Sequence, residues 1–256
     1  VFTMVELGGL GLIVWTARSD LGEVVTRADE LVGLPTSFAG WGGVLGGAFL
    51  AFFAFLGFED MDSVAEETKN APIVLPRAIL ITLGLTTVIY MMVAAVAVLR
   101  VEPALLAATD APLALIYERA GGNGDILAFI AALAMVNGAL VQLVMVPRVV
   151  YGLANLGLVP TWAGSVSLRT RTPLRATIAG AAVIGVLAVA IELEWLARVT
   201  SATTMAIFAT VNAALLVVKR RYGPTSTFQV PGWVPALGTV TALTMFAAEV
   251  ARLILG

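Results

Sequence analysis

Long apolar segments recur along this sequence and constrain its fold more than any other feature. A helix that crosses a bilayer needs about 20 mostly apolar residues. Segments of this kind occupy Val1–Ala17, Trp41–Phe58, Ala78–Leu99, Ile126–Leu153, Ala176–Ile191, Leu196–Val218 and Val234–Leu255. The loops between them are short and hold most of the proline and charge. The pattern predicts an all-α integral membrane protein with about seven transmembrane helices, forming one transmembrane domain over residues 1–256.

The composition favours the bilayer as solvent and excludes several functions. Apolar residues make up 59% of the chain and charged residues 12%, whereas soluble domains average roughly 45–50% and about 25%. The net charge is −2, and the longest basic run is Lys219-Arg220-Arg221, so a nucleic-acid partner is not expected.

The chain has no cysteine and no histidine, which removes thiolate nucleophiles, the usual metal ligands and the commonest general base. The remaining carboxylates cluster in loops rather than on facing helices. We therefore expect no enzyme activity, no metal and no cofactor. A seven-helix receptor or pump and a membrane enzyme remain alternatives, although Lys69 and Lys219, the only lysines, stand at segment ends rather than mid-helix.

Positive charges favour alternate loops. One set of loops carries Lys69, Arg77, Arg148, Arg169, Arg171, Arg175, Lys219, Arg220 and Arg221, and the other carries Arg18, Arg27, Arg100, Arg119 and Arg198. Because lysine and arginine collect on the cytoplasmic side of membrane proteins, the loops after the second, fourth and sixth segments are predicted to face the cytoplasm.

The second apolar segment ends unusually. Its aromatic-rich half reaches Gly57-Phe58 and then turns acidic at Glu59-Asp60. A helix interrupted by glycine and polar residues at membrane depth is typical of a transporter binding site. Alternatively, the span ends at Phe58 and the acids lie among lipid headgroups.

Three parts of the sequence resemble the amino acid–polyamine–organocation permeases. The first is Phe52-Phe53-Ala54-Phe55-Leu56-Gly57-Phe58-Glu59-Asp60 with Ala65-Glu66-Glu67-Thr68-Lys69-Asn70 and Leu75-Pro76, similar to the sixth helix and its following loop. The second is Val136-Asn137-Gly138-Ala139 with Pro147-Arg148 and Gly157-Leu158-Val159-Pro160, similar to the eighth helix and its exit. The third is Ala209-Thr210-Val211-Asn212 with Lys219-Arg220-Arg221, similar to the end of the tenth helix.

The resemblance implies a LeuT-type fold, in which five helices repeat with inverted topology. On that map the seven segments are helices five to eleven, so the fold is incomplete and the chain is expected to be the C-terminal part of a longer permease. The sequence begins at Val1, inside an apolar run. The implied function is secondary active transport of amino acids or related amines across the cytoplasmic membrane by alternating access. The expected partners are the amino acid, protons and the lipid bilayer, with an amino acid exchanger as the alternative.

The resemblance also implies a substrate site at the broken helix. The substrate ammonium would contact the backbone carbonyls of Ala54, Phe55 and Leu56, just before Gly57. Phe53 stands at the position of an aromatic gate over the substrate, and Phe58 is a second candidate. Both phenylalanines also suit ordinary packing or lipid contact.

Two acids are candidates for proton coupling. Glu59 corresponds to a glutamate linked to proton and substrate handling in arginine/agmatine antiporters, and the alternative is a hydrated acid. Glu6 lies within an apolar helix, where an ionisable group is a functional candidate, and desolvation favours the neutral form of a carboxyl. Some proton-coupled relatives carry a lysine near this position, so Glu6 departs from their pattern. The alternative for Glu6 is a structural ion pair.

The predicted eighth helix bears on the coupling ion. Sodium-coupled LeuT-type carriers use serine or threonine hydroxyls on this helix, and residues 124–151 contain neither. Proton coupling or exchange is therefore favoured over sodium symport. Asn137 and Gln142 are its polar candidates for substrate contact, and Asn137 equally suits a hydrogen bond to a neighbouring helix.

Overall fold

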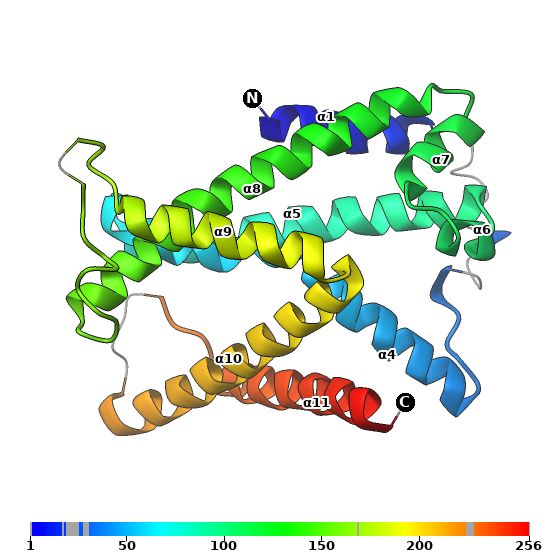
Figure 1. The fold of residues 1–256 in the computed structure, drawn as a ribbon. Helices are drawn as coiled ribbons and strands as arrows, with labels where there is room; N and C mark the ends of the chain where they lie inside the picture. Colours follow the sequence, from blue (N-terminus) through cyan, green and yellow to red (C-terminus); the bar gives the residue numbers. More distant parts are fainter. Residues whose placement is uncertain are drawn as a thin grey trace. The chain divides into compact units, whose positions relative to one another are not determined.

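The computed structural model describes residues 2–16, 18, 26–27, 31–167, 169–223 and 228–255. Its elements are α1 (Phe2–Thr16), α4 (Phe38–Phe53), the 3₁₀ helix η2 (Phe58–Glu67), α5 (Ala71–Arg100), α6 (Pro103–Ala107), α7 (Pro112–Arg119), α8 (Gly124–Asn155), α9 (Leu174–Ala190), α10 (Leu193–Tyr222) and α11 (Trp233–Leu255), drawn in Figure 1. The described residues include no strand. The all-α prediction is confirmed.

Five segments in the described part of the chain are long and apolar enough to cross a membrane. They are Gly40–Met61, Ala71–Arg100, Gly124–Asn155, Leu193–Tyr222 and Trp233–Arg252. The other two predicted spans correspond to α1 and α9, which are apolar but have only 15 and 17 residues. The predicted limits Val1 and Ala17 lie outside the described residues.

The start of α5 differs from the sequence prediction. The sequence predicts a segment that begins at Ala78, but α5 begins at Ala71 and contains both Pro72 and Pro76. Pro72 lies in the first turn, where backbone N–H groups have no intrahelical acceptor. Pro76 removes one hydrogen bond from the second turn, a modest cost within a helix of 30 residues.

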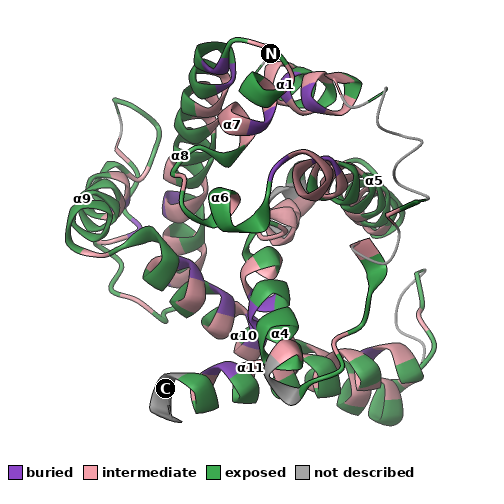
Figure 2. Ribbon diagram, turned by 90° about the vertical axis from the view of Figure 1, so that its right-hand side faces the viewer, coloured by how far each residue is buried: buried purple, intermediate pink, exposed green. Residues whose placement is uncertain are grey.

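Most of the helix surface is exposed, as the predominance of green in Figure 2 shows. The exposed side chains include many large apolar ones, such as Val189, Leu193 and Met135. In water such a surface would drive aggregation, but in a bilayer lipid tails or other apolar helices cover it without cost. The burial pattern thus agrees with a membrane protein.

The helices gather into two compact units, and the first comprises residues 1–34 and 84–180. Here α1 and α7 pack against α8. Its core consists of Ile13, Val96, Val101, Ile116 and Leu127. A methyl group at Gly9 of α1 would lie 2.9 Å from the Ile130 side chain of α8. The missing side chain therefore allows α1 and α8 to approach closely, as small residues do between membrane helices.

The second unit comprises residues 35–83 and 181–256. In this unit α10 packs against α11 and α4. The buried side chains of α10 are Ala197, Ser201, Met205 and Ala209, spaced four residues apart so that they form one stripe along the helix.

An ion pair links α10 to α11. The Arg198 guanidinium donates to the Glu249 carboxylate at 2.7 Å and to Glu194 at 2.8 Å. The Glu249 side chain is only 3% exposed, whereas that of Glu194 is 65% exposed. The buried carboxylate depends on Arg198, because a buried charge without a partner is strongly destabilising.

We predict that Arg198→Met destabilises the complete protein by about 3–5 kcal/mol, since it removes the partner of the buried Glu249 carboxylate. The double variant Arg198→Met with Glu249→Leu should recover most of this loss. The measurement is thermal unfolding in detergent, with Glu194→Gln as the exposed control. Equal destabilisation by the single and double variants would contradict the prediction.

Candidate transport site

The helix that contains the predicted site is interrupted at the expected residues. The α-helix α4 ends at Phe53, and η2 begins at Phe58. Between them the backbone tightens, because the amides of Ala54, Phe55 and Leu56 each bond to the carbonyl three residues earlier, at 3.0, 3.0 and 3.2 Å. A tight turn of this kind ends the α-helical pattern.

Gly57 forms the corner of the interruption. Its φ of 116° lies in the left-handed region, which glycine adopts without the strain that a side chain would cause. A methyl group at this position would meet no neighbouring atom within 4 Å. The requirement for glycine here is therefore conformational rather than steric crowding by neighbours.

Glu59 stabilises the start of η2. Its carboxylate Oε2 accepts a hydrogen bond from the backbone amide of Gly57 at 2.8 Å. A negative charge at a helix N-terminus is favourable. Among the described residues, no backbone amide donates to the carbonyl of Leu56, one of the three carbonyls predicted to receive the substrate ammonium.

The aromatic residues of the break have different surroundings. Phe53, the predicted gate, is 37% exposed. Phe58 is half-buried and its ring packs against Phe208 of α10, with ring centres 5.7 Å apart. Phe52 contacts the same Phe208 ring at 6.0 Å. The sequence prediction did not include Phe208, because nothing in an apolar helix distinguishes one phenylalanine from another.

A cavity of about 680 Å³ adjoins the break. Its lining is apolar apart from Glu59 and consists of Phe58, Glu59, Ala65, Ala71, Pro72, Leu75, Pro76, Ile79, Ile207, Phe208 and Val211. The cavity therefore offers space for an apolar group beside the first turn of η2.

The first unit brings together two predicted polar residues. The Asn137 side-chain amide donates to Glu6 Oε1 at 3.0 Å, linking α8 to α1. Asn137 thus bonds a neighbouring helix, one of the two roles expected for it. Gln142 is exposed. Glu6 and Asn137 belong to one compact unit and residues 53–59 to the other.

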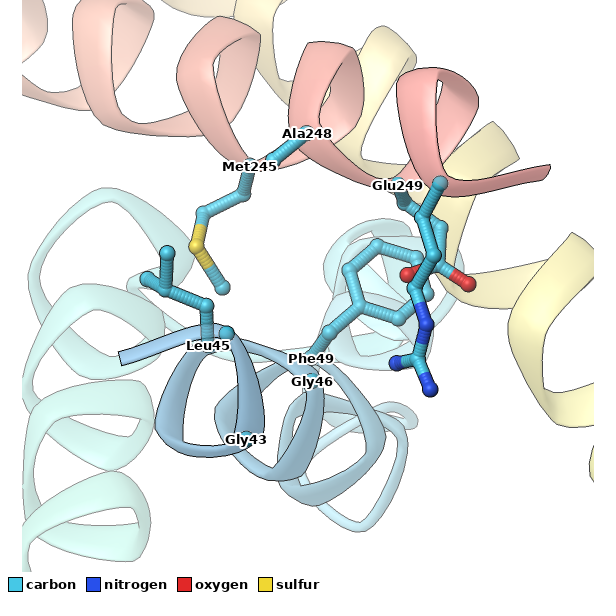
Figure 3. Close-up of a pocket in the computed structure, with 9 residues that line it drawn as sticks. Gly43, Leu45, Gly46, Phe49, Met245, Ala248 and Glu249 are labelled. Carbon is cyan, nitrogen blue, oxygen red and sulfur yellow. The ribbon is translucent and has the colours of Figure 1, made fainter. Parts of the chain in front are cut away.

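A second cavity, of about 420 Å³, lies between α4 and α11 (Figure 3). Its lining residues are Gly42, Gly43, Leu45, Gly46, Phe49, Met245, Ala248, Glu249 and Arg252. Arg252 lies so close to α4 that a methyl group on Gly46 would be 2.5 Å from its Nη1 atom. None of these residues was predicted as functional. Across the described ranges, no group of three or more acidic side chains could hold a metal ion.

A family model described as amino acid permease matches residues 9–251. The chain belongs to this family of membrane transporters. The family is one of carriers rather than enzymes, and the chain is accordingly part of a multi-pass membrane protein. The resemblance seen in the sequence is confirmed.

Several named relatives share about a third of the aligned residues. The chain is 33% identical over 184 residues to the branched-chain amino acid permease BcaP of Bacillus subtilis, covering 71% of this chain and 40% of the relative. It is 33% identical over 205 residues to cationic amino acid transporter 1 of Arabidopsis thaliana, covering 78% of this chain and 34% of that relative. It is 31% identical over 195 residues to the vacuolar cationic amino acid transporter 4 of the same plant, covering 75% of this chain and 32% of that relative. The matched chain thus spans two fifths or less of these relatives.

We predict that Gly57→Ala weakens substrate binding by the complete protein and costs about 1–3 kcal/mol of stability, because a side chain is strained at this φ. Gly84→Ala is the matched control. Gly84 lies inside α5 with nothing near its added methyl, so this change should alter stability by less than about 0.5 kcal/mol. Thermal unfolding and binding of a labelled amino acid measure both effects. Normal binding by Gly57→Ala would show that the corner can tolerate a side chain.

Proposed function

We propose that the complete protein containing this chain transports amino acids across the cytoplasmic membrane by alternating access, with protons as the coupling ion. The observation that carries the proposal is the interruption at residues 54–57 inside a membrane-length segment of an amino acid permease family member. We further propose that residues 1–256 form part of one LeuT-type transmembrane domain, because the named relatives are more than twice as long as the matched region.

The break supplies groups suited to an amino acid. Backbone carbonyls at the end of a half-helix carry partial negative charge and attract a cation. The carbonyls of Ala54, Phe55 and Leu56 would therefore receive the substrate ammonium. We assign the gate to Phe53, whose side chain is 37% exposed beside the break. Phe58 is held against another ring, so we assign it a packing role rather than a gating one.

The proposed proton site is the contact between Glu6 and Asn137. An amide N–H bonds more strongly to a charged carboxylate than to a neutral carboxyl. Protonation of Glu6 would therefore weaken the link between α1 and α8. A proton taken up here would change how tightly the two helices are held. Glu59 is a second candidate, because its charge stabilises the start of η2.

Exchange of one amino acid for another is the alternative function. The absence of serine and threonine from residues 124–151 disfavours sodium symport and is compatible with exchange as well as with proton coupling. The two mechanisms differ in whether a proton gradient alone drives uptake, and the experiment below separates them.

We predict that the complete protein in liposomes takes up labelled leucine or arginine when an inward proton gradient is imposed. A sodium gradient alone should not drive uptake. Glu6→Gln should abolish the response to the proton gradient, because an amide cannot carry the proton. Glu192→Gln is the control, since Glu192 is exposed and makes no side-chain cap at the start of α10.

Each other result has a definite meaning. Uptake driven by sodium alone would contradict proton coupling. Uptake only against preloaded amino acid, unaltered in Glu6→Gln, would identify an exchanger and leave Glu6 a structural role. No uptake of either amino acid by folded protein would contradict the proposed substrate class.

A further inference from the structure

One aromatic ring of α10 contacts both halves of the interrupted helix. Phe208 meets Phe52, in the last turn of α4, edge to face with an interplanar angle of 86° and ring centres 6.0 Å apart. It meets Phe58, the first residue of η2, at 5.7 Å and 51°. These separations fall within the range favoured by aromatic pairs. Phe208 therefore spans the interruption from outside, as a bridge between residues that precede and follow Gly57.

The angle between the two half-helices depends on contacts of this kind. A continuous helix is held straight by its own hydrogen bonds. Here the α-helical hydrogen bonds end at Phe53, and a 3₁₀ helix begins at Phe58. Gly57, at the corner, restricts the backbone less than any other residue. The start of η2 also borders the cavity of about 680 Å³, whose lining includes both Phe58 and Phe208.

Phe208 is not simply part of the helix core. The buried stripe of α10 runs through Ala197, Ser201, Met205 and Ala209. Phe208 lies beside this stripe and is only half-buried. Shortening its side chain would thus leave the contacts of the buried stripe in place.

We propose that Phe208 is a positioning residue for substrate binding. By holding Phe52 and Phe58 against one ring, it fixes the orientation of η2 relative to α4 and hence the direction of the carbonyls at the break. The inference rests on the proposed function, in which those carbonyls receive the substrate ammonium. Phe208 itself need not touch the substrate.

The test uses the complete protein and compares Phe208→Leu, Phe208→Met and Phe208→Tyr. The first two variants lose the ring, and methionine is flexible enough to refill most of the space. Tyrosine keeps the ring and should rescue the function. The matched control is Phe129→Leu, because Phe129 is on α8 and 66% exposed.

For Phe208→Leu and Phe208→Met, we expect the Kd of a labelled amino acid to rise at least tenfold. Phe208→Tyr and Phe129→Leu should stay within about twofold of the unaltered protein, a difference of roughly 0.4 kcal/mol or less. We also expect faster hydrogen exchange of backbone amides in residues 54–67 in the two ring-less variants, with no change in α8. Combining Phe208→Leu with Phe52→Leu should add little to the loss caused by Phe208→Leu alone.

The two kinds of readout separate this inference from the proposed function. If the unaltered protein binds no amino acid, the proposed function fails, and hydrogen exchange still decides whether Phe208 orders η2. Normal Kd and normal exchange in both ring-less variants would overturn the inference. Loss of stability throughout the protein, with exchange raised equally in α8, would assign Phe208 to general packing and overturn it as well.

Discussion

The hydrogen-bonding demand of the backbone in hydrocarbon underlies this structure. A peptide group without a partner is costly where no water can reach it, so each of the five membrane-length segments in the described part of the chain is helical along most of its length. The interruption at residues 54–57 stands out against that constraint. It persists because short-range turns satisfy the amides of residues 54–56 and because the Glu59 carboxylate accepts from Gly57. Among the described residues no backbone amide donates to the Leu56 carbonyl, which suits it to contact a cationic group of a substrate.

Two polar contacts between helices illustrate different uses of charge in an apolar setting. Arg198 and Glu249 form a buried ion pair with a second carboxylate on the same guanidinium, an arrangement that stays intact only while both charges remain. The contact between Asn137 and Glu6 joins an uncharged amide to an acid. In the proposed function, a proton on Glu6 would weaken this hydrogen bond. The first contact therefore suits a permanent link between α10 and α11, and the second suits a link between α1 and α8 whose strength can change.

Local pattern predicted much of this molecule, and long-range contacts were the part that it could not supply. The Gly57 break, the acid that follows it and five of the seven apolar spans were predicted, because each depends on a few neighbouring residues. The other two predicted spans correspond to α1 and α9, which are apolar but shorter. The partners Phe208, Arg198 and Glu249 were not predicted. Membrane helices are apolar on all sides, so the pattern does not reveal which face meets another helix. Glu6 and Asn137 were each identified, but their contact joins residues 131 positions apart.

The glycine content of α4 lowers the intrinsic stability of this helix. Within its 16 residues the helix contains Gly40, Gly42, Gly43, Gly46 and Gly47, each costing about 1 kcal/mol relative to alanine in water. The longer helices α5 and α8 carry one and three glycines. In hydrocarbon the backbone has no better alternative than the helix, and α4 persists. Contact with water would therefore weaken the first half of α4 more than the same stretch of α5 or α8.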